Sequence, residues 1–485
     1  MAALKAETKE QKRTDMIGEL YETDVAIVVA GNVDSGKSSL IGVLHTGELD
    51  DGDGLARNSV AKHKHEITTG KTSAISTRTM KTDNGKLITL IDLCGHEKYL
   101  KTTAFGITGY FPDYAIVVVA ANRGIMKMTK EHLGILIYMK VPITIIITRS
   151  DIAPESIYEK TVKDIRTICR MYNKKAEVIN SYKDALLPTT DFNKKHGIDY
   201  AKVVDIAKKV HTSCDYVPVI TVSNKTGYYV DVMRNYISNL KPRSLWDPTT
   251  INGSIYYIDT VFNPPGIGLV LSGIVKGKSI KIGDNMYIGP VGKTFIQIRI
   301  RSIHNNNRTL ISELKDHQRG CIAISQIGKG ELTRQMIQKG MIVVSTEKLT
   351  DNVCYRFKAE IEILHHSATI RTNYSPIIHV GTVRQSARII DIDGIVFRKD
   401  HDDKQLDKKI DKENLRTGDK ALVTFKFKFK PEFLEIGSTF FFKEGTTRGK
   451  GEIKEIICIA NDIDAEPDIP RAAKRLRDAR LKSLV

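Results

Sequence analysis

The sequence predicts a doubly wound, mostly parallel α/β domain followed by two antiparallel β-barrels. Up to about residue 242, apolar runs such as residues 25–30 alternate with helical stretches such as residues 156–172, which is the pattern of a parallel sheet covered by helices. A glycine-rich loop follows the first apolar run, at the strand end where open α/β sheets bind ligands. Beyond residue 249, short strands such as residues 255–261 and 270–275 are separated by turn sequences, which is typical of antiparallel barrels.

The loop after the first strand has the pattern G-x-x-x-x-G-K-S. Its members are Gly31, Asn32, Val33, Asp34, Ser35, Gly36, Lys37 and Ser38, and Ser39 follows. In such a loop the backbone N–H groups cradle the α- and β-phosphates, the Lys reaches the β- and γ-phosphates, and the Ser hydroxyl binds Mg²⁺. The motif requires a strand before it and a helix after it, which residues 26–29 and 38–44 supply, so a chance glycine-rich turn is a poor alternative. The sequence therefore predicts a nucleoside triphosphate site that uses Mg²⁺.

Polar residues follow three further predicted strands. The first set is Asp92 and Gly95, the second is Thr148, Arg149 and Asp151, and the third is Ser223, Asn224 and Lys225. An acidic residue at the position of Asp92 holds Mg²⁺ through its water shell. Gly95 has no Cβ, so its N–H can approach the γ-phosphate closely.

Together with the phosphate loop, these three segments resemble the GTPase motif series, and within it the translational elongation-factor class. The resemblance implies that Asp151 accepts hydrogen bonds from guanine, which adenine cannot donate. Arg149 departs from the usual Lys, although an Arg plane can also stack on a base. Thr148 replaces the usual Asn, and its hydroxyl can still tie this loop to the phosphate loop.

The run of residues 92–103, D-L-C-G-H-E-K-Y-L-K-T-T, is similar to the GTP-binding protein 1 and 2 family, relatives of elongation factor 1-alpha. Further matching motifs lie at residues 46–50, 63–66, 128–132, 364–366, 384–388 and 415–419. The resemblance covers roughly residues 22–457 and implies an α/β P-loop GTPase domain with two β-barrels after it. We therefore divide the chain into a polar extension (1–21), a GTP-binding domain (22–242), a linker (243–249), two β-barrels (250–348 and 349–460) and a basic tail (461–485).

The resemblance also implies roles in GTP hydrolysis. His96 orients the attacking water, with simple packing beside the loop as the alternative reading. Thr72 binds Mg²⁺ in the GTP state, and the nearby Thr68 and Thr69 stay open as alternatives. Asp34 is similar to the Asp that recruits a monovalent cation in this class. Residues 47–76 are expected to form a loop with two states, ordered by the γ-phosphate and Mg²⁺.

Composition limits the class of protein and its partners. At 485 residues the chain is too long for one core, and its net charge of +17 favours a polyanionic partner, for which we expect tRNA or the ribosome. Candidate phosphate contacts are Arg384, Arg388 and the Lys face of residues 425–430, whose Phe face is expected in a barrel core. No apolar run approaches the ~20 residues of a membrane span, and the start of the chain is too polar for a signal peptide. The six scattered cysteines indicate reduced thiols, so we expect a cytoplasmic monomer without membrane contact.

The predicted function is that of a Mg²⁺-dependent GTPase of the translation elongation-factor class, which cycles between GTP and GDP and binds tRNA or the ribosome in its GTP state. One alternative is a GTP-dependent adaptor in ribosome rescue or mRNA turnover, which recruits protein partners without delivering aminoacyl-tRNA. Another is a GTP sensor with negligible turnover. GTP-dependent binding of aminoacyl-tRNA would indicate the elongation-factor role, and a stable protein partner would indicate the adaptor. Hydrolysis that does not change when His96 is lost would indicate the sensor.

Overall fold

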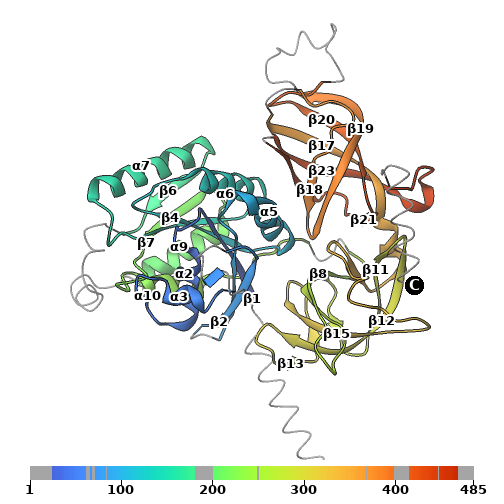
Figure 1. The fold of residues 1–485 in the computed structure, drawn as a ribbon, viewed down its shortest axis with the longest axis horizontal. Helices are drawn as coiled ribbons and strands as arrows, with labels where there is room; N and C mark the ends of the chain where they lie inside the picture. The colour runs from blue at the N-terminus through green and yellow to red at the C-terminus, as the bar shows by residue number, and fades with distance from the viewer. Residues whose placement is uncertain are drawn as a thin grey trace, which may run out of the picture. The chain divides into compact units, whose positions relative to one another are not determined.

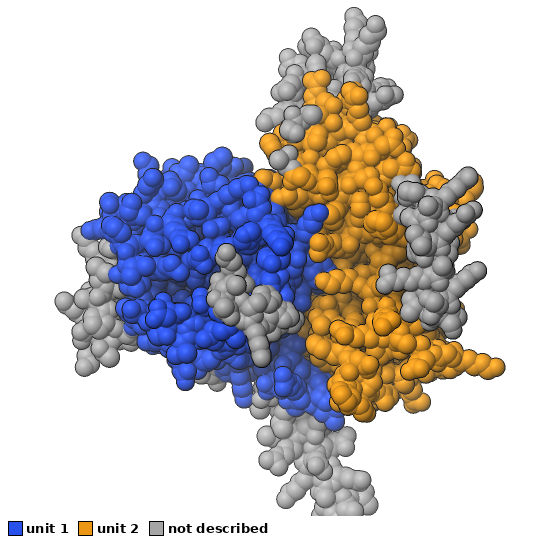
Figure 2. All heavy atoms as spheres, in the orientation of Figure 1, with its two compact units in different colours: residues 1–246, 304–311 blue, residues 247–303, 312–485 orange. Residues whose placement is uncertain are grey.

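The computed structural model describes residues 24–61, 66–67, 72–82, 85–180, 200–247, 251–366, 369–397, 414–445 and 447–467. The chain forms two compact units, coloured separately in Figure 2. The first comprises Met1–Trp246 with His304–Ile311, and the second comprises Asp247–Ile303 with Ser312–Val485. The predicted extension 1–21 and most of the predicted basic tail lie outside the described residues.

The first unit contains a seven-stranded sheet with the strand order β2-β3-β1-β4-β5-β7-β6, and helices cover both of its faces (Figure 1). All neighbouring pairs are parallel except β2 and β3, which run antiparallel. The strands are β1 (Asp24–Gly31), β2 (Ser76–Lys81), β3 (Leu87–Asp92), β4 (Tyr114–Ala120), β5 (Ile143–Thr148), β6 (Lys175–Val178) and β7 (Tyr216–Thr221). The helices are α2 (Lys37–Thr46), α3 (Leu55–Asn58), η1 (Glu97–Tyr99), α5 (Leu100–Gly109), α6 (Lys127–Tyr138), α7 (Glu155–Met171), α9 (Tyr200–Thr212) and α10 (Val230–Asn239).

The central strands of this sheet are apolar throughout because both faces are covered. β1, β3, β4 and β5 are buried along almost their whole length, as expected for parallel strands between two helical layers. On one face, alternate residues of β1 pack with apolar side chains of α2, α9 and α10 in a single core. The predicted doubly wound α/β domain is confirmed. The phosphate loop and the three predicted polar segments follow the carboxyl ends of β1, β3, β5 and β7.

At the edge of this sheet, Lys175–Val178 form the strand β6, which pairs with β7. Its side chains are only partly buried, so it lacks the apolar pattern of the central strands. Residues 47–76, which were expected to form a loop with two states, contain the short helix α3, whose first amides are capped by aspartates described below.

The second unit contains two closed antiparallel barrels, which confirms the predicted β-barrel fold. In the first, the order β11-β16-β8-β9-β15-β12 is closed by pairing of β11 with β12, and in the second, β20-β19-β18-β22-β23-β17 is closed by pairing of β20 with β17. The first set is β8 (Ser254–Phe262), β9 (Val270–Gly277), β10 (Ile280–Lys281), β11 (Asn285–Val291), β12 (Thr294–Asn305), β13 (Leu310–Ile311), β14 (Glu313–Leu314), β15 (Arg319–Gln326) and β16 (Ile342–Val344). After η4 (Glu347–Asn352) come β17 (Val353–His365), β18 (Ile377–Val380), β19 (Val383–Phe397), β20 (Lys420–Phe427), β21 (Glu432–Phe433), β22 (Thr439–Glu444), β23 (Thr447–Cys458) and η6 (Ile459–Asn461).

The alternating Phe and Lys residues at 425–430 follow the prediction only in part. Phe425 and Phe427 are buried in the core of the second barrel, as predicted. Phe429 is 53% exposed because β20 ends at Phe427. Lys426 is buried instead of facing outward, since its Nζ lies 2.5 Å from Asp464 Oδ2. Lys426 is therefore not available as a phosphate contact.

Glu432, a buried carboxyl in the second unit, predicts a pH dependence of stability. Burial raises the pKa of Glu432 to about 7 from the ordinary value of 4.5, although Lys430 and Gln385 oppose the shift. Because the folded protein holds this proton more tightly than the unfolded chain, the resulting stability is fully present below pH 4.5 and is lost as the pH rises to about 7. Between pH 4.5 and about 7, we expect the free energy of unfolding of the wild type to fall by about 3 kcal/mol more than that of Glu432→Gln. Urea unfolding of both proteins, followed by circular dichroism at several pH values, measures this, and parallel curves would contradict it.

Two further observations concern the chain as a whole. All six cysteines are free thiols, as the scattered spacing predicted. In the ranges described above, no helix is both long enough and apolar enough to cross a membrane.

Candidate functional site

The loop between β1 and α2 has the strained backbone of a phosphate-binding loop. Gly31, Asp34 and Gly36 have φ values of 141°, 59° and 83°, a region of backbone conformation that favours glycine. A Cβ on Gly31 would collide with the carbonyl oxygen of Val118 on β4, so this position also needs glycine for space. The loop therefore keeps its shape because β1 and β4 lie side by side in the sheet.

Lys37, at the start of α2, is almost completely buried within this loop. Its Nζ donates to the carbonyl oxygen of Asn32 at 2.7 Å, across the loop. Burial lowers the pKa of Lys37, and the nearby carboxylate of Asp92 partly opposes that shift. A buried ammonium group held by one carbonyl is a strong attractor for a polyanion such as a phosphate chain.

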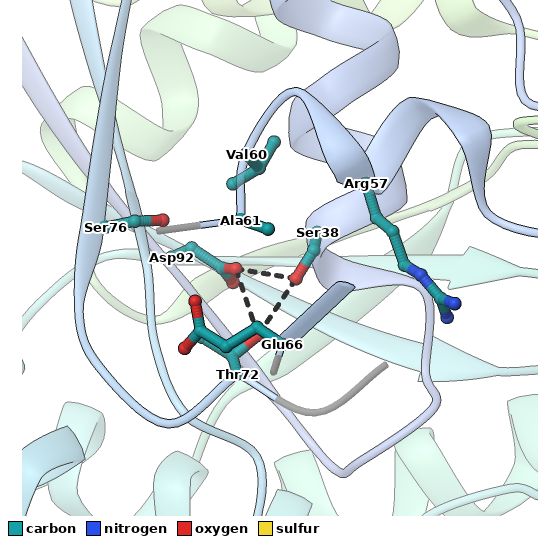
Figure 3. Close-up of a pocket in the computed structure, with 8 residues that line it drawn as sticks. All are labelled: Ser38, Arg57, Val60, Ala61, Glu66, Thr72, Ser76 and Asp92. Atoms are coloured by element: carbon teal, nitrogen blue, oxygen red, sulfur yellow. Dashed lines mark hydrogen bonds between the residues drawn. The ribbon is translucent and has the colours of Figure 1, made fainter. Parts of the chain in front are cut away.

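Three predicted metal residues, Ser38, Thr72 and Asp92, come together in one cluster (Figure 3). Ser38 Oγ donates to Asp92 Oδ2 at 2.6 Å and lies 3.1 Å from Thr72 Oγ1. Thr72 Oγ1 also donates to Asp92 Oδ2, at 3.4 Å. These residues come from α2, from the end of β3 and from the segment just before β2, which the sheet brings together because β2 pairs with β3.

The electrostatics of Asp92 fit a cation in this cluster. Asp92 is 1% exposed, and burial raises its pKa although Lys37 opposes the shift. Among the described residues, its Oδ1 has no hydrogen-bond partner. A buried carboxylate oxygen without a partner, beside two hydroxyls, presents the hard oxygen ligands that Mg²⁺ prefers. Within the described ranges, no group of three or more His, Cys, Asp or Glu could hold a metal, so a metal here would rely on the hydroxyls.

Thr72 is held in this cluster by Glu66, which is buried in the same segment. Glu66 Oε1 accepts from Ser73 N at 2.7 Å, from Ser73 Oγ at 2.9 Å and from Ala74 N at 3.2 Å. Three hydrogen bonds to one carboxylate oxygen fix the backbone directly after Thr72. The alternative metal residues Thr68 and Thr69 and the neighbouring run 62–65 lie outside the described residues.

Gly95 lies against the phosphate loop. A Cβ added there would stand 2.6 Å from Lys37 Nζ and 2.7 Å from the backbone of Asn32 and Val33. The turn is anchored from behind, where Thr103 Oγ1 donates to the carbonyl oxygen of Cys94 at 2.7 Å. The glycine therefore brings the end of β3 as close to the loop as two backbones can come.

A hollow opens beside these residues. Its lining includes Val33, Asp34, Gly36, Lys37, Ser38, Ser39, Arg57, Thr72, Gly95, His96 and Arg149. Three of these side chains are cationic and come from different segments, which suits a phosphate chain.

His96 lies at the rim of this hollow and is exposed. Its Nδ1 accepts from Lys98 N at 3.1 Å, which caps the short helix η1. Its ring also meets the Tyr99 ring edge-on, with 6.2 Å between centroids. The imidazole is thus held by its own turn, directly after Gly95.

The predicted base-recognition residues gather at the ends of β5 and β7. Thr148 Oγ1 donates to the carbonyl oxygen of Ser35 at 2.7 Å, so the predicted tie between this loop and the phosphate loop is present. Ser223 Oγ donates to Asp151 Oδ1 at 3.1 Å and accepts from Thr226 N at 3.2 Å. In the part of the chain that the structure describes, the buried Oδ1 of Asn224 has no partner. Lys225 is exposed beside these residues.

Asp34 fits the expected monovalent cation poorly. Its Oδ2 is ion paired with Arg123 Nη1 at 3.5 Å, and both side chains are partly exposed. Arg123 lies on the loop after β4 and already brings a positive charge to Asp34. A monovalent cation at Asp34 would therefore have to compete with Arg123.

Some residues around the site had no predicted role. His132 of α6 is fully buried, and its Nδ1 accepts from Gly31 N at 3.1 Å, at the first residue of the phosphate loop. Glu66 and His132 lie inside motifs that carried the family resemblance, which was the only available indication of their importance. Arg57 and Arg123 lie outside those motifs, and no local pattern singles them out.

Comparison with known proteins agrees with this geometry. Residues 22–244 match the Elongation factor Tu GTP binding domain family. GTP-binding protein 1 of Xenopus laevis is 33% identical over 486 residues, which span 94% of this chain and 67% of that protein. GTP-binding protein 2 of Homo sapiens is 33% identical over 464 residues, which span 90% of this chain and 70% of that protein.

More distant relatives extend the similarity through the barrels. Elongation factor 1-alpha of Sulfurisphaera tokodaii is 24% identical over 476 residues, which span 89% of this chain and 96% of that protein. Among solved structures, translation elongation factor SelB of Methanococcus maripaludis, in complex with the GTP analogue GppNHp, superposes with a TM-score of 0.62 at 20% identity. That alignment covers 91% of this chain and 81% of SelB, so the fold is similar in both units.

Proposed function

Because this chain belongs to the translational GTPases, within the family of GTP-binding proteins 1 and 2, we propose that it cycles between GTP and GDP states and binds tRNA or the ribosome in its GTP state. As a member of this family it is a GTPase. The observation that carries the proposal is the Ser38–Thr72–Asp92 cluster, because it ties the segment before β2 to the phosphate site. A net charge of +17 further supports a polyanionic partner.

Each group in the site has a role in this proposal. The loop amides and Lys37 bind the phosphates, and Gly95 N–H approaches the γ-phosphate. The hydroxyls of Ser38 and Thr72 hold Mg²⁺, with Asp92 behind them. When bound, the metal neutralises charge on the β- and γ-phosphates.

Hydrolysis and base selection use the remaining groups. His96 orients the attacking water once its imidazole leaves the Lys98 amide. Asp151 accepts from the guanine edge, with Ser223 fixing the carboxylate. Arg149 lies beside the phosphates and the base, and Thr148 keeps the two loops together.

We propose that the protein works in the cytoplasm as a monomer. A role as an adaptor in ribosome rescue or mRNA turnover uses the same site with a protein partner in place of aminoacyl-tRNA, and a sensor uses it with negligible turnover.

The experiment that tests the proposal is GTP hydrolysis by the purified protein with and without ribosomes, together with filter binding of aminoacyl-tRNA in GppNHp and in GDP. The unaided rate should be near the ~10⁻⁴–10⁻² s⁻¹ of intrinsic GTPases. A large rise with ribosomes, or tRNA binding specific to GppNHp, supports the proposal. If neither is seen, the translation-factor role is wrong, and GTP-dependent capture of a stable protein partner would then favour the adaptor.

A further inference from the structure

Arg57 is one of the three cationic side chains that line the nucleotide hollow, with Lys37 and Arg149. We propose that Arg57 binds the phosphates of the bound nucleotide directly, and that α3 is a fixed arm that holds it in place. This inference rests on the proposed nucleotide site and names a further ligand in it.

The Arg57 side chain lies on the phosphate side of the site. It lines the hollow with Lys37, Ser38 and Gly95, and also a smaller hollow with Thr72 and Asp92. In Figure 3 its guanidinium points away from the Asp92 carboxylate. Arg57 therefore shares the phosphate side of the site without neutralising the metal-binding carboxylate.

The Nε–H of this guanidinium has no acceptor among the described residues. The Nε atom is buried. Arg57 also forms no ion pair with any carboxylate of the described chain. A buried N–H without an acceptor is unfavourable, and a phosphate offers two oxygens at the spacing of an arginine fork. The site thus presents a charged donor to which the described residues offer no acceptor for its Nε–H.

Two aspartates cap the start of α3. Asp51 Oδ1 accepts from the backbone N–H groups of Asp53, Gly54 and Leu55, at 2.8, 2.9 and 3.0 Å. Asp50 Oδ1 accepts from Ala56 N at 2.9 Å. Four amides at the start of this short helix are thus satisfied by two adjacent carboxylates, directly before Arg57.

The helix α3 packs against the elements that build the site. Ala56 packs with Val43 of α2 and Val230 of α10. Gly42 of α2 allows this approach, because a Cβ there would collide with the carbonyl oxygen of Ala56. Asp50 N donates to the carbonyl oxygen of Asn224 at 2.9 Å, which fastens the arm to the base-recognition loop.

The far end of the arm is held as well. Arg78 of β2 donates from Nε to the carbonyl oxygen of Ser59 at 2.9 Å and from Nη2 to that of Val60 at 3.1 Å. α3 is therefore fixed on both sides of Arg57 and attached to α2, which carries Lys37 and Ser38. These contacts fix the backbone that carries Arg57 relative to the phosphate loop, so the segment itself need not be ordered when Arg57 binds a phosphate.

The test is the dissociation constant of mant-GTP and mant-GDP for the full chain, measured by fluorescence. We expect Arg57→Ala to weaken mant-GTP binding by about 10–100-fold, because each charged hydrogen bond is worth a factor in this range. Arg57→Lys keeps the charge without the fork and should lie between the wild type and Arg57→Ala. Asn58→Ala, an exposed neighbour on the same helix, should bind within about twofold of the wild type.

Gly42→Ala tests the arm itself. Its Cβ displaces α3 while Arg57 stays in the sequence, so it should weaken mant-GTP binding in the same direction as Arg57→Ala. Wild-type affinity in Arg57→Ala, or an equal loss in Arg57→Ala and Asn58→Ala, would overturn the proposal. These affinities need neither ribosomes nor tRNA, so the inference can fail while the proposed function stands, and the reverse also holds.

Discussion

Replacing His96 with Ala should abolish most of the partner-stimulated GTP hydrolysis while leaving nucleotide affinity within about twofold of the wild type. Transfer of a phosphoryl group to water depends on a water molecule held in line with the γ-phosphate. His96 is at the rim of the hollow, directly after Gly95, and its imidazole accepts a hydrogen bond from its own turn. We expect a loss of ~10²–10⁴-fold in the stimulated rate, the usual contribution of such a group.

Single-turnover hydrolysis of GTP with saturating ribosomes measures this effect, and mant-GTP titration measures affinity. Lys98→Ala is a matched control, because it keeps the backbone N–H that His96 accepts and removes only an exposed side chain. Full stimulation in His96→Ala would show that the ring only packs beside the loop. Loss of GTP binding in the same variant would instead indicate a structural role for the ring.

Replacing Gly95 with Ala should weaken GTP binding by about 100-fold or more, which is roughly 2.7 kcal/mol. The added Cβ would stand 2.6 Å from Lys37 Nζ and 2.7 Å from backbone atoms of Asn32 and Val33. Backbone cannot yield as the end of a flexible side chain can, so either the phosphate loop or the end of β3 has to move. Both movements separate groups that must converge on the phosphates.

Gly394→Ala is the control for Gly95→Ala. No atom lies within 4 Å of a Cβ at Gly394, and its φ is ordinary. The variant should therefore bind mant-GTP like the wild type. If Gly95→Ala keeps wild-type affinity and an unchanged unfolding midpoint, the close approach of β3 to the loop has no part in nucleotide binding.

Much of the fold and of the candidate site could be predicted because it follows from local patterns. The strands of the first sheet are apolar runs, and in a parallel sheet their carboxyl ends share one edge, so Ser38 and Asp92 were expected near each other. Thr72 joins them because it precedes β2, which pairs with the strand that ends at Asp92. The barrels follow from short strands broken by turns.

The remainder depends on contacts between distant segments. The burial of Lys426 depends on Asp464, and Phe429 is exposed because the strand ends two residues before it. β6 has little apolar pattern because edge strands are only partly covered. Arg57 acquires its position through Gly42, a glycine inside an ordinary helix that has no obvious significance in the sequence.

The antiparallel pairing of β2 with β3 constrains how the phosphate site can communicate with the rest of the first unit. Ser76 is opposite Asp92, and Met80, four residues on, is buried in the core. Sliding β2 by one residue would turn Met80 outward, so the strand cannot shift gradually past its neighbour. Thr72 precedes the end of β2 that pairs with Asp92, whereas Met80 fixes the other end in the core. Loss of the Thr72 contacts should therefore loosen the pairing at Ser76 before that at Met80, and amide hydrogen exchange along β2 measures this difference.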